Sequence, residues 1–143
     1  MPAANRTVTR ETVVQTVFEA EFRDATKHQE YLTRILTENA ANAPGELDLK
    51  LANDLTQAVF DNFEVIKKEI ARLAPDWPYE KIARFDRAVL LTAIAELKFI
   101  TEKIPPAVTL NEYIEITKNF SDDPSRRFVN GVLSAVKKEI DKP

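Results

Sequence analysis

The residue types that most often carry catalysis are scarce in this chain of 143 residues. There is no cysteine and a single histidine, His28, so a cysteine- or histidine-based zinc site is excluded. No serine lies between glycines in the way that a nucleophile elbow requires. Asp122 and Asp123 precede Pro124 and are better explained as a helix cap than as an acid–base pair. We therefore expect neither an enzyme nor a metal site.

Glycine is equally scarce, since only Gly45 and Gly131 occur. A phosphate loop or a dinucleotide-binding fingerprint needs several glycines in one turn, because backbone amides must reach the phosphate. No cofactor is therefore expected, and the chain is most simply a binding protein. Gly131 falls inside the last predicted helix, where glycine costs about 1 kcal/mol relative to alanine. It therefore predicts a close approach of another backbone or of a ligand.

Arginines and aromatic rings remain as candidates for binding chemistry. Arg6 and Arg10 lie at and just before the start of the first predicted helix. Either they belong to a solvated helix end or they contact RNA. In the last predicted helix, Phe128 lies about 95° from the centre of the apolar stripe, at the edge of the core. There it either packs against a neighbouring helix or is available to a partner. Arg127 lies on the opposite, solvent side of that helix.

The elements that must position these residues are all predicted to be helices. Apolar spacing predicts a first helix that begins between residues 7 and 9, a second near 27–39, and a long third over 47–73 with one continuous stripe. A capping box at 109–112 is expected to start the next helix. An acidic cap at Ser121–Pro124 starts the last one, which ends near residue 140.

The stretch 88–100 is predicted to be the central helix. Its apolar residues point in nearly every direction, so it should run through the core with at least three amphipathic helices packed around it. A chain of this length can bury such a core within a single domain. The fold class is therefore expected to be all-α.

Charge and hydropathy limit the possible partners. The net charge of −3 argues against indiscriminate nucleic-acid binding but leaves room for a small local patch. No apolar run approaches the roughly 18 residues of a membrane span, and the N-terminus has no apolar signal region. A soluble, cytoplasmic protein with no membrane partner is expected.

Several motifs in the second half of the chain fall in a recognisable order. They are FDRAVLL at 85–91, AEL at 95–97, NEYIE at 111–115 and RFVNGVL at 127–133. With Arg10, Glu11, Gln15 and Phe18 in the first half, they resemble the NusB family of transcription antitermination factors. The resemblance is dense from Phe85 to Leu133 and thin before it.

The resemblance implies a fold and a set of partners. The fold would be two three-helix bundles packed roughly perpendicular within one domain, at about 7–73 and 78–140, with six to seven helices. The partners would be the boxA element of ribosomal RNA leader transcripts, the small-subunit ribosomal protein NusE and the transcription elongation complex. No small-molecule substrate is implied.

The resemblance also implies site residues. The RNA face would comprise five of them: Arg6, Arg10, Phe18, Arg127 and Phe128. On such a face unpaired bases stack on aromatic rings while arginines contact phosphate. Asp86 would lie on the protein-partner face. Glu96 would either serve the partner or satisfy a buried amide or arginine.

The chain departs from the family pattern near its N-terminus. The usual run of arginines is reduced to Arg6 and Arg10, and acids outnumber arginines between residues 5 and 24. Fewer phosphate contacts lower RNA affinity and flatten its salt dependence. A helical protein-interaction adaptor of the same fold, with weak RNA binding or none, is therefore the alternative function. The NusB-like domain fused to ribosomal RNA methyltransferases is disfavoured, because no catalytic domain or glycine-rich cofactor loop follows.

Overall fold

The computed structural model describes residues 5–22, 29–100 and 104–142. Over these ranges it contains helices and no strand, so the all-α prediction is confirmed. The elements are α1 (Arg6–Phe22), α2 (Gln29–Ala41), α3 (Leu49–Asp61), α4 (Phe63–Leu73), the 3₁₀ turn η2 (Tyr79–Lys81), α5 (Arg84–Phe99), α6 (Pro106–Phe120) and α7 (Asp123–Asp141). The predicted start of the second helix at Lys27, and His28, lie outside the described residues.

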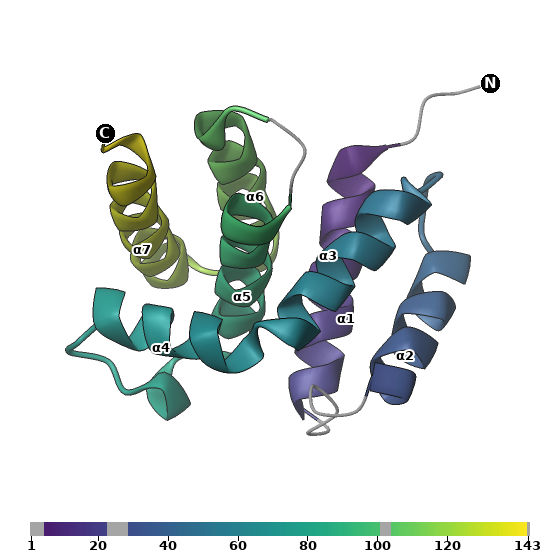
Figure 1. Cartoon of the computed structure of the whole chain (residues 1–143), viewed down its shortest axis with the longest axis horizontal. Coiled ribbons are helices and arrows are strands. Elements are labelled where there is room, and N and C mark those ends of the chain that lie inside the picture. The colour runs from purple at the N-terminus through teal and green to yellow at the C-terminus, as the bar shows by residue number, and fades with distance from the viewer. Residues whose placement is uncertain (1–4, 23–28, 101–103, 143) are drawn as a thin grey trace.

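Helix α5 is the centre of the molecule, as predicted. Every residue from Ala88 to Ala95 is 0% exposed. Five helices pack around α5, namely α1, α3, α4, α6 and α7. Figure 1 shows α5 and α6 in the middle of the molecule, with α7 on one side and α1 and α3 on the other. A helix that is apolar on nearly all sides can be stabilised only where neighbours cover each side, which is the arrangement observed.

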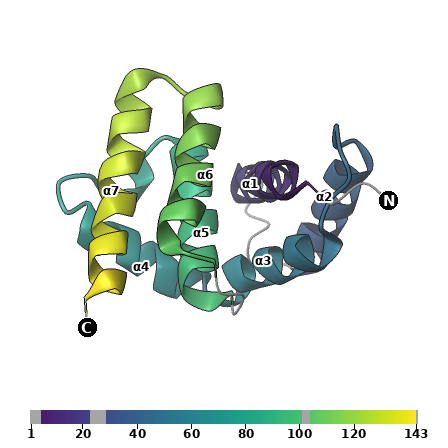
Figure 2. The same cartoon turned by 90° about the horizontal axis from the view of Figure 1, so that it is seen from above.

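The prediction of one long third helix is wrong, because the chain breaks at Asn62 into α3 and α4. The Asn62 side chain donates a 2.8 Å hydrogen bond to the carbonyl oxygen of Ala58, which its own backbone N–H also approaches at 3.1 Å. Asparagine side chains compete in this way with helix hydrogen bonding. After the break the chain runs in a new direction, and α4 packs against α5 and α7; Figure 2 shows these helices from above.

Two further local predictions need correction. Helix α6 begins at Pro106, so Thr109 lies inside the helix and does not cap it. Glu112, the other half of the expected capping box, instead accepts a 3.1 Å hydrogen bond from the Thr7 hydroxyl. At Gly131 a Cβ would meet no atom within 4 Å, so no close approach among the described residues requires that glycine.

The start of α7 was predicted correctly. Asp122 is the N-cap residue, and its Oδ1 accepts a 2.9 Å hydrogen bond from the backbone N–H of Ser125. Proline in the first turn costs the helix no hydrogen bond, because the first amides have no partner within the helix. This cap fixes the direction in which α7 leaves α6, and with it the position of Phe128.

The main hydrophobic core runs through the domain, and a second, smaller cluster joins Ala20 of α1 to Leu32 and Ile35 of α2. The main core contains residues of α1 and α3 together with residues of α5, α6 and α7. Because α4 packs against α5 and α7, we propose that the two bundles divide at the break at Asn62 and not at the predicted 73–78.

Candidate nucleic-acid interface

A buried polar network joins α1 to α5 and α6. Arg10 is 2% exposed, and its Nε and Nη2 lie 2.9 and 2.8 Å from the carboxylate oxygens of Glu96. The hydroxyl of Tyr113 donates a 2.6 Å hydrogen bond to the same carboxylate. Burial alone would lower the pKa of Arg10, but the bonds to Glu96 raise it above its ordinary value. Arg10 therefore stays charged inside the protein.

This network decides what Arg10 and Glu96 can do. Of the two roles considered for Glu96, the structure supports the second, in which its carboxylate satisfies a buried arginine. Arg10 is oriented away from solvent, so a direct contact with RNA phosphate would require the ion pair to open. Breaking a buried ion pair leaves an uncompensated charge and is strongly unfavourable.

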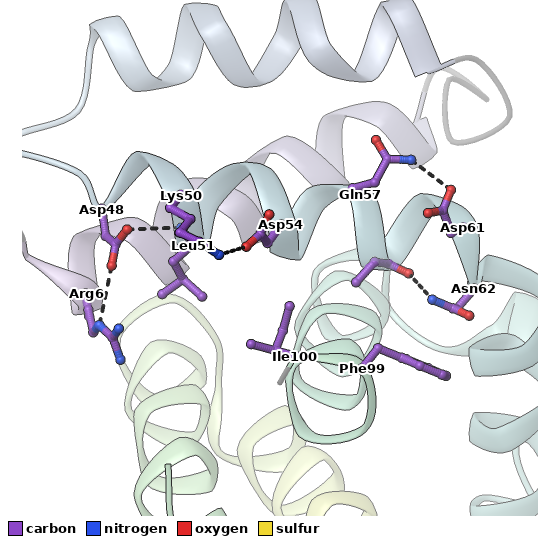
Figure 3. A pocket seen from close by; sticks show the side chains of 11 residues that line it. Arg6, Asp48, Lys50, Leu51, Asp54, Gln57, Asp61, Asn62, Phe99 and Ile100 are labelled. Carbon is purple, nitrogen blue, oxygen red and sulfur yellow. Dashed lines mark hydrogen bonds and ion pairs between the residues drawn. The ribbon is translucent and has the colours of Figure 1, made fainter. Parts of the chain in front are cut away.

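Arg6, at the first turn of α1, lies beside acidic groups. Its Nε is 3.6 Å from Asp48 Oδ2, and both line a cavity of about 740 Å³ between α3 and the end of α5 (Figure 3). Two more aspartates line this cavity, Asp54 and Asp61. Lys50 also lines the cavity and pairs with Asp54, so three carboxylates face two cations, a balance that does not favour a phosphate backbone. Among the described residues no group of histidines and acids could hold a metal ion.

Phe18 lies at the opposite end of α1, in a row of three rings. Its ring centroid is 6.3 Å from that of Phe85, which in turn lies 6.1 Å from that of Phe120. Phe120 is 62% exposed and ends α6. Phe120 was not predicted to be a surface ring. The available signal was its position at a helix end, directly after the polar pair Lys118–Asn119, where little core remains to be filled.

Phe128 lies at the edge of the core, as the helical angle predicts. It is half-buried, and its ring packs edge-on against Trp77, with centroids 6.1 Å apart and planes 73° apart. Trp77 is 55% exposed and was not foreseen as part of a site. Arg127 is exposed beside this pair. The result is an aromatic edge with a cation next to it.

Asp86 was expected on a partner face, but it is only 4% exposed. It lines a pocket of about 180 Å³, whose other walls include Trp77, Ile82 and Phe128. Burial raises the pKa of the Asp86 carboxyl, partly offset by a hydrogen bond with Ser125. A flat protein surface cannot reach this carboxylate. Only a group that enters the pocket can contact it.

The predicted RNA-binding residues therefore form one group on α1 and another group on α7. Arg6 and Arg10 lie near the N-terminal end of α1, and Phe18 lies about 12 Å or more further along its axis. Arg127 and Phe128 lie in the first turns of α7, near the N-terminal end of α5. Phe85 of the Phe18 row and Asp86 of the Phe128 pocket are consecutive residues of α5, but side chains of consecutive helix residues point about 100° apart, so the row and the pocket are separate.

These features define the protein class as an all-helical binding protein organised around one buried helix. The profile of the NusB family matches residues 7–138. The chain belongs to the NusB family. The relatives that this chain matches are transcription antitermination proteins, which are not enzymes, so the expected class of protein is confirmed.

Similar proteins agree over almost the whole chain. The transcription antitermination protein NusB of Bacillus cereus is 36% identical over 132 residues, which cover 92% of this chain and 96% of the relative. The solved structure of NusB from T. maritima has a TM-score of 0.77 at 30% identity, covering 96% of this chain and 94% of that one. These matches confirm the NusB-like fold.

A third match is a structure of the antitermination factors NusB and NusE in complex with dsRNA. Its matching chain has a TM-score of 0.77 at 21% identity and covers 93% of this chain and 96% of that one. At this identity the match shows a common fold. Within the described part of this chain, no helix is long and apolar enough to cross a membrane.

Proposed function

We propose that this protein is a cytoplasmic antitermination factor that binds boxA-like RNA of ribosomal RNA leader transcripts together with NusE, as part of the transcription elongation complex. Family membership supports antitermination. A NusB of the same fold forms a complex with NusE and dsRNA, which supports these partner classes.

The observation that carries the RNA proposal is the aromatic edge at the start of α7. Unpaired bases stack on aromatic rings, and arginines supply charge for the backbone. Phe128 and Trp77 present adjoining rings at the surface, and Arg127 is exposed beside them. Phe18 lies in a separate row of rings with Phe85 and Phe120, which could bind a further part of the RNA.

The alternative function, a helical protein-interaction adaptor, is favoured because both N-terminal arginines lie next to carboxylates. Arg10 is committed to Glu96, and Arg6 lies beside Asp48. Few N-terminal cations are then offered to phosphate, so the isolated protein should bind RNA weakly and with a shallow salt dependence. NusE would supply the remaining charge and RNA contacts.

A gel-shift titration tests the proposal. Leader RNA with a boxA-like element and a scrambled RNA of equal length are each titrated with the protein, with and without NusE. We expect weak binding by the protein alone and tighter binding with NusE that prefers the boxA-like RNA. If NusE binds the protein but the complex shows no RNA preference, the adaptor function takes its place.

A further inference from the structure

The bend between α3 and α4 depends on a single residue. Asn62 has φ −117° and ψ 18°, outside the range of an α-helix, while the residues on either side of it are helical. Its backbone N–H lies 3.1 Å from the carbonyl oxygen of Ala58, and its own carbonyl oxygen accepts a 2.8 Å hydrogen bond from the backbone N–H of Ile66. Both contacts have the spacing of a continuous helix. A change of backbone conformation around Asn62 would therefore join α3 and α4 into one helix.

The sequence on both sides of Asn62 is typical of a single helix. Buried apolar residues recur at steps of three and four through the bend, at Leu55, Val59, Ile66 and Ile70, with the partly buried Phe63 between them. No glycine or proline, the residues that usually end or kink a helix, lies between residues 49 and 73. A straight helix over this range would be about 37 Å long and would keep one apolar stripe. The local sequence thus favours the straight form.

The packing between the two bundles explains why a single chain is bent. Helices α1 and α3 pack against α5, and the ion pair of Arg10 and Glu96 crosses from α1 to α5 with both side chains only 3% exposed. A straight helix from α3 into α4 would carry α1 away from the α5 of its own chain. The apolar surface and the ion pair between the bundles would then be exposed. They can be buried again only against the same surfaces of another copy of the chain.

We propose that two copies of this chain form a dimer by exchanging their N-terminal bundles, α1 to α3, with α3 and α4 of each copy joined into one straight helix. In this exchanged dimer α1 and α3 of one copy pack against α5 of the other, so every contact between bundles is made again with the same residues. Short hinges between exchangeable units favour such dimers. Each half of the dimer would contain Phe18 of one copy beside Phe85 of the other. The inference does not depend on the proposed RNA-binding function.

The first test changes the hinge residue. Protein unfolded in urea is refolded at high protein concentration, and the dimer is quantified by size-exclusion chromatography with light scattering. Asn62→Ala removes the side chain that interrupts the helix and favours helix formation at both hinges of a dimer, so the dimer association constant should rise by about tenfold over the wild type. Asn53→Ala is the matched control, because it makes the same substitution at an exposed residue inside α3. It should leave the association constant unchanged.

The second test distinguishes exchange from a dimer formed by surface contact. Arg10→Met leaves Glu96 buried without its partner, and Glu96→Gln leaves Arg10 buried without its partner, so each variant alone is destabilised. When the two variants are unfolded and refolded together, an exchanged heterodimer has one half with the native ion pair and one half in which both charges are absent. We expect about tenfold or more dimer in the mixture than in either variant alone, with a higher melting temperature. Native mass spectrometry identifies the heterodimer, and the comparison holds even where one variant alone does not fold.

Two results would overturn the inference. One is a dimer association constant of Asn62→Ala that is no higher than that of Asn53→Ala, or the absence of dimer in both variants. The other is a mixture of Arg10→Met and Glu96→Gln that forms no more dimer, and melts at no higher temperature, than the variants refolded separately. In a dimer formed by surface contact each chain keeps its own two bundles together, so the ion pair cannot be restored.

Discussion

At Phe128, folding and binding place different demands on one side chain. Replacing a fully buried phenylalanine by alanine typically lowers the free energy of unfolding by about 3–5 kcal/mol. Phe128 is half-buried and meets Trp77 at a steep angle between the two ring planes, so part of its surface lies outside the core. That exposed part is what a base can use.

We predict that Phe128→Ala lowers RNA affinity by about 1–3 kcal/mol, because one stacking platform is lost. The free energy of unfolding should fall by about 1–3 kcal/mol, less than for a core phenylalanine. Gel shifts with NusE present and urea titrations measure the two quantities. A loss of stability with unchanged RNA affinity of the folded protein would make Phe128 a packing residue only.

Arg127→Ala is the companion prediction. Arg127 is exposed, so the melting temperature should hardly change. RNA binding should weaken and lose about one unit of its salt slope, as expected for one phosphate contact. Binding equal to that of the wild type at all salt concentrations would remove Arg127 from the RNA surface.

For single residues, features that depend on near neighbours in sequence could be predicted, and features that depend on distant residues could not. Helical angles placed Phe128 at the core edge and local spacing placed the Asp122 cap, because both depend on near neighbours in sequence. The burial of Arg10 depends on Glu96, which lies 86 residues away. Nothing in the local pattern around Arg10 could indicate that pairing.

At the scale of elements, a surface ion-pair network connects α4, α5 and α7. Glu69 of α4 accepts a 3.0 Å hydrogen bond from Lys98 of α5. Arg72 binds Glu69 and also reaches Glu139 of α7 at 2.6 Å. The hydrogen bond from Arg72 is the main cause that lowers the pKa of Glu69 to about 2.

This lowered pKa predicts a pH dependence of stability. A carboxyl whose folded pKa lies below its unfolded pKa stabilises the fold above the unfolded value, and that contribution is lost as pH falls toward the folded value. Glu69→Gln should therefore be less stable than the wild type at neutral pH, by less than about 1 kcal/mol because the pairs are partly exposed. The difference should close between about pH 4.5 and pH 2. Urea titrations across that range measure it, and a constant difference would contradict the assignment.

The elements themselves were predicted to different degrees. The central helix was evident because apolar residues on all sides leave few other arrangements. The break between α3 and α4 was not, since the apolar stripe continues through it and only the Asn62 side chain interrupts the helix. The pocket around Asp86 needed the packing of α7 against η2 and α5, which no single segment encodes.

For the whole molecule, the pair Arg10–Glu96 connects the N-terminal helix to the second bundle. Arg10→Met should lower the free energy of unfolding by about 3–5 kcal/mol, because the Glu96 carboxylate is left buried without its partner. Arg10→Met combined with Glu96→Gln should recover much of that loss, since no buried charge remains and the amide can still accept from Tyr113. Chemical denaturation of the single and double variants measures both effects. A loss below about 1 kcal/mol in Arg10→Met would mean that the ion pair is not structural.

The central claim concerns antitermination, and transcription itself tests it most directly. A template that carries a boxA-like leader upstream of a terminator is transcribed in a reconstituted elongation complex containing NusE, with and without this protein. The account predicts that adding the protein raises the fraction of transcripts that read through the terminator, and that mutating the boxA-like element removes the increase. An equal read-through with and without the protein on the intact leader would contradict it.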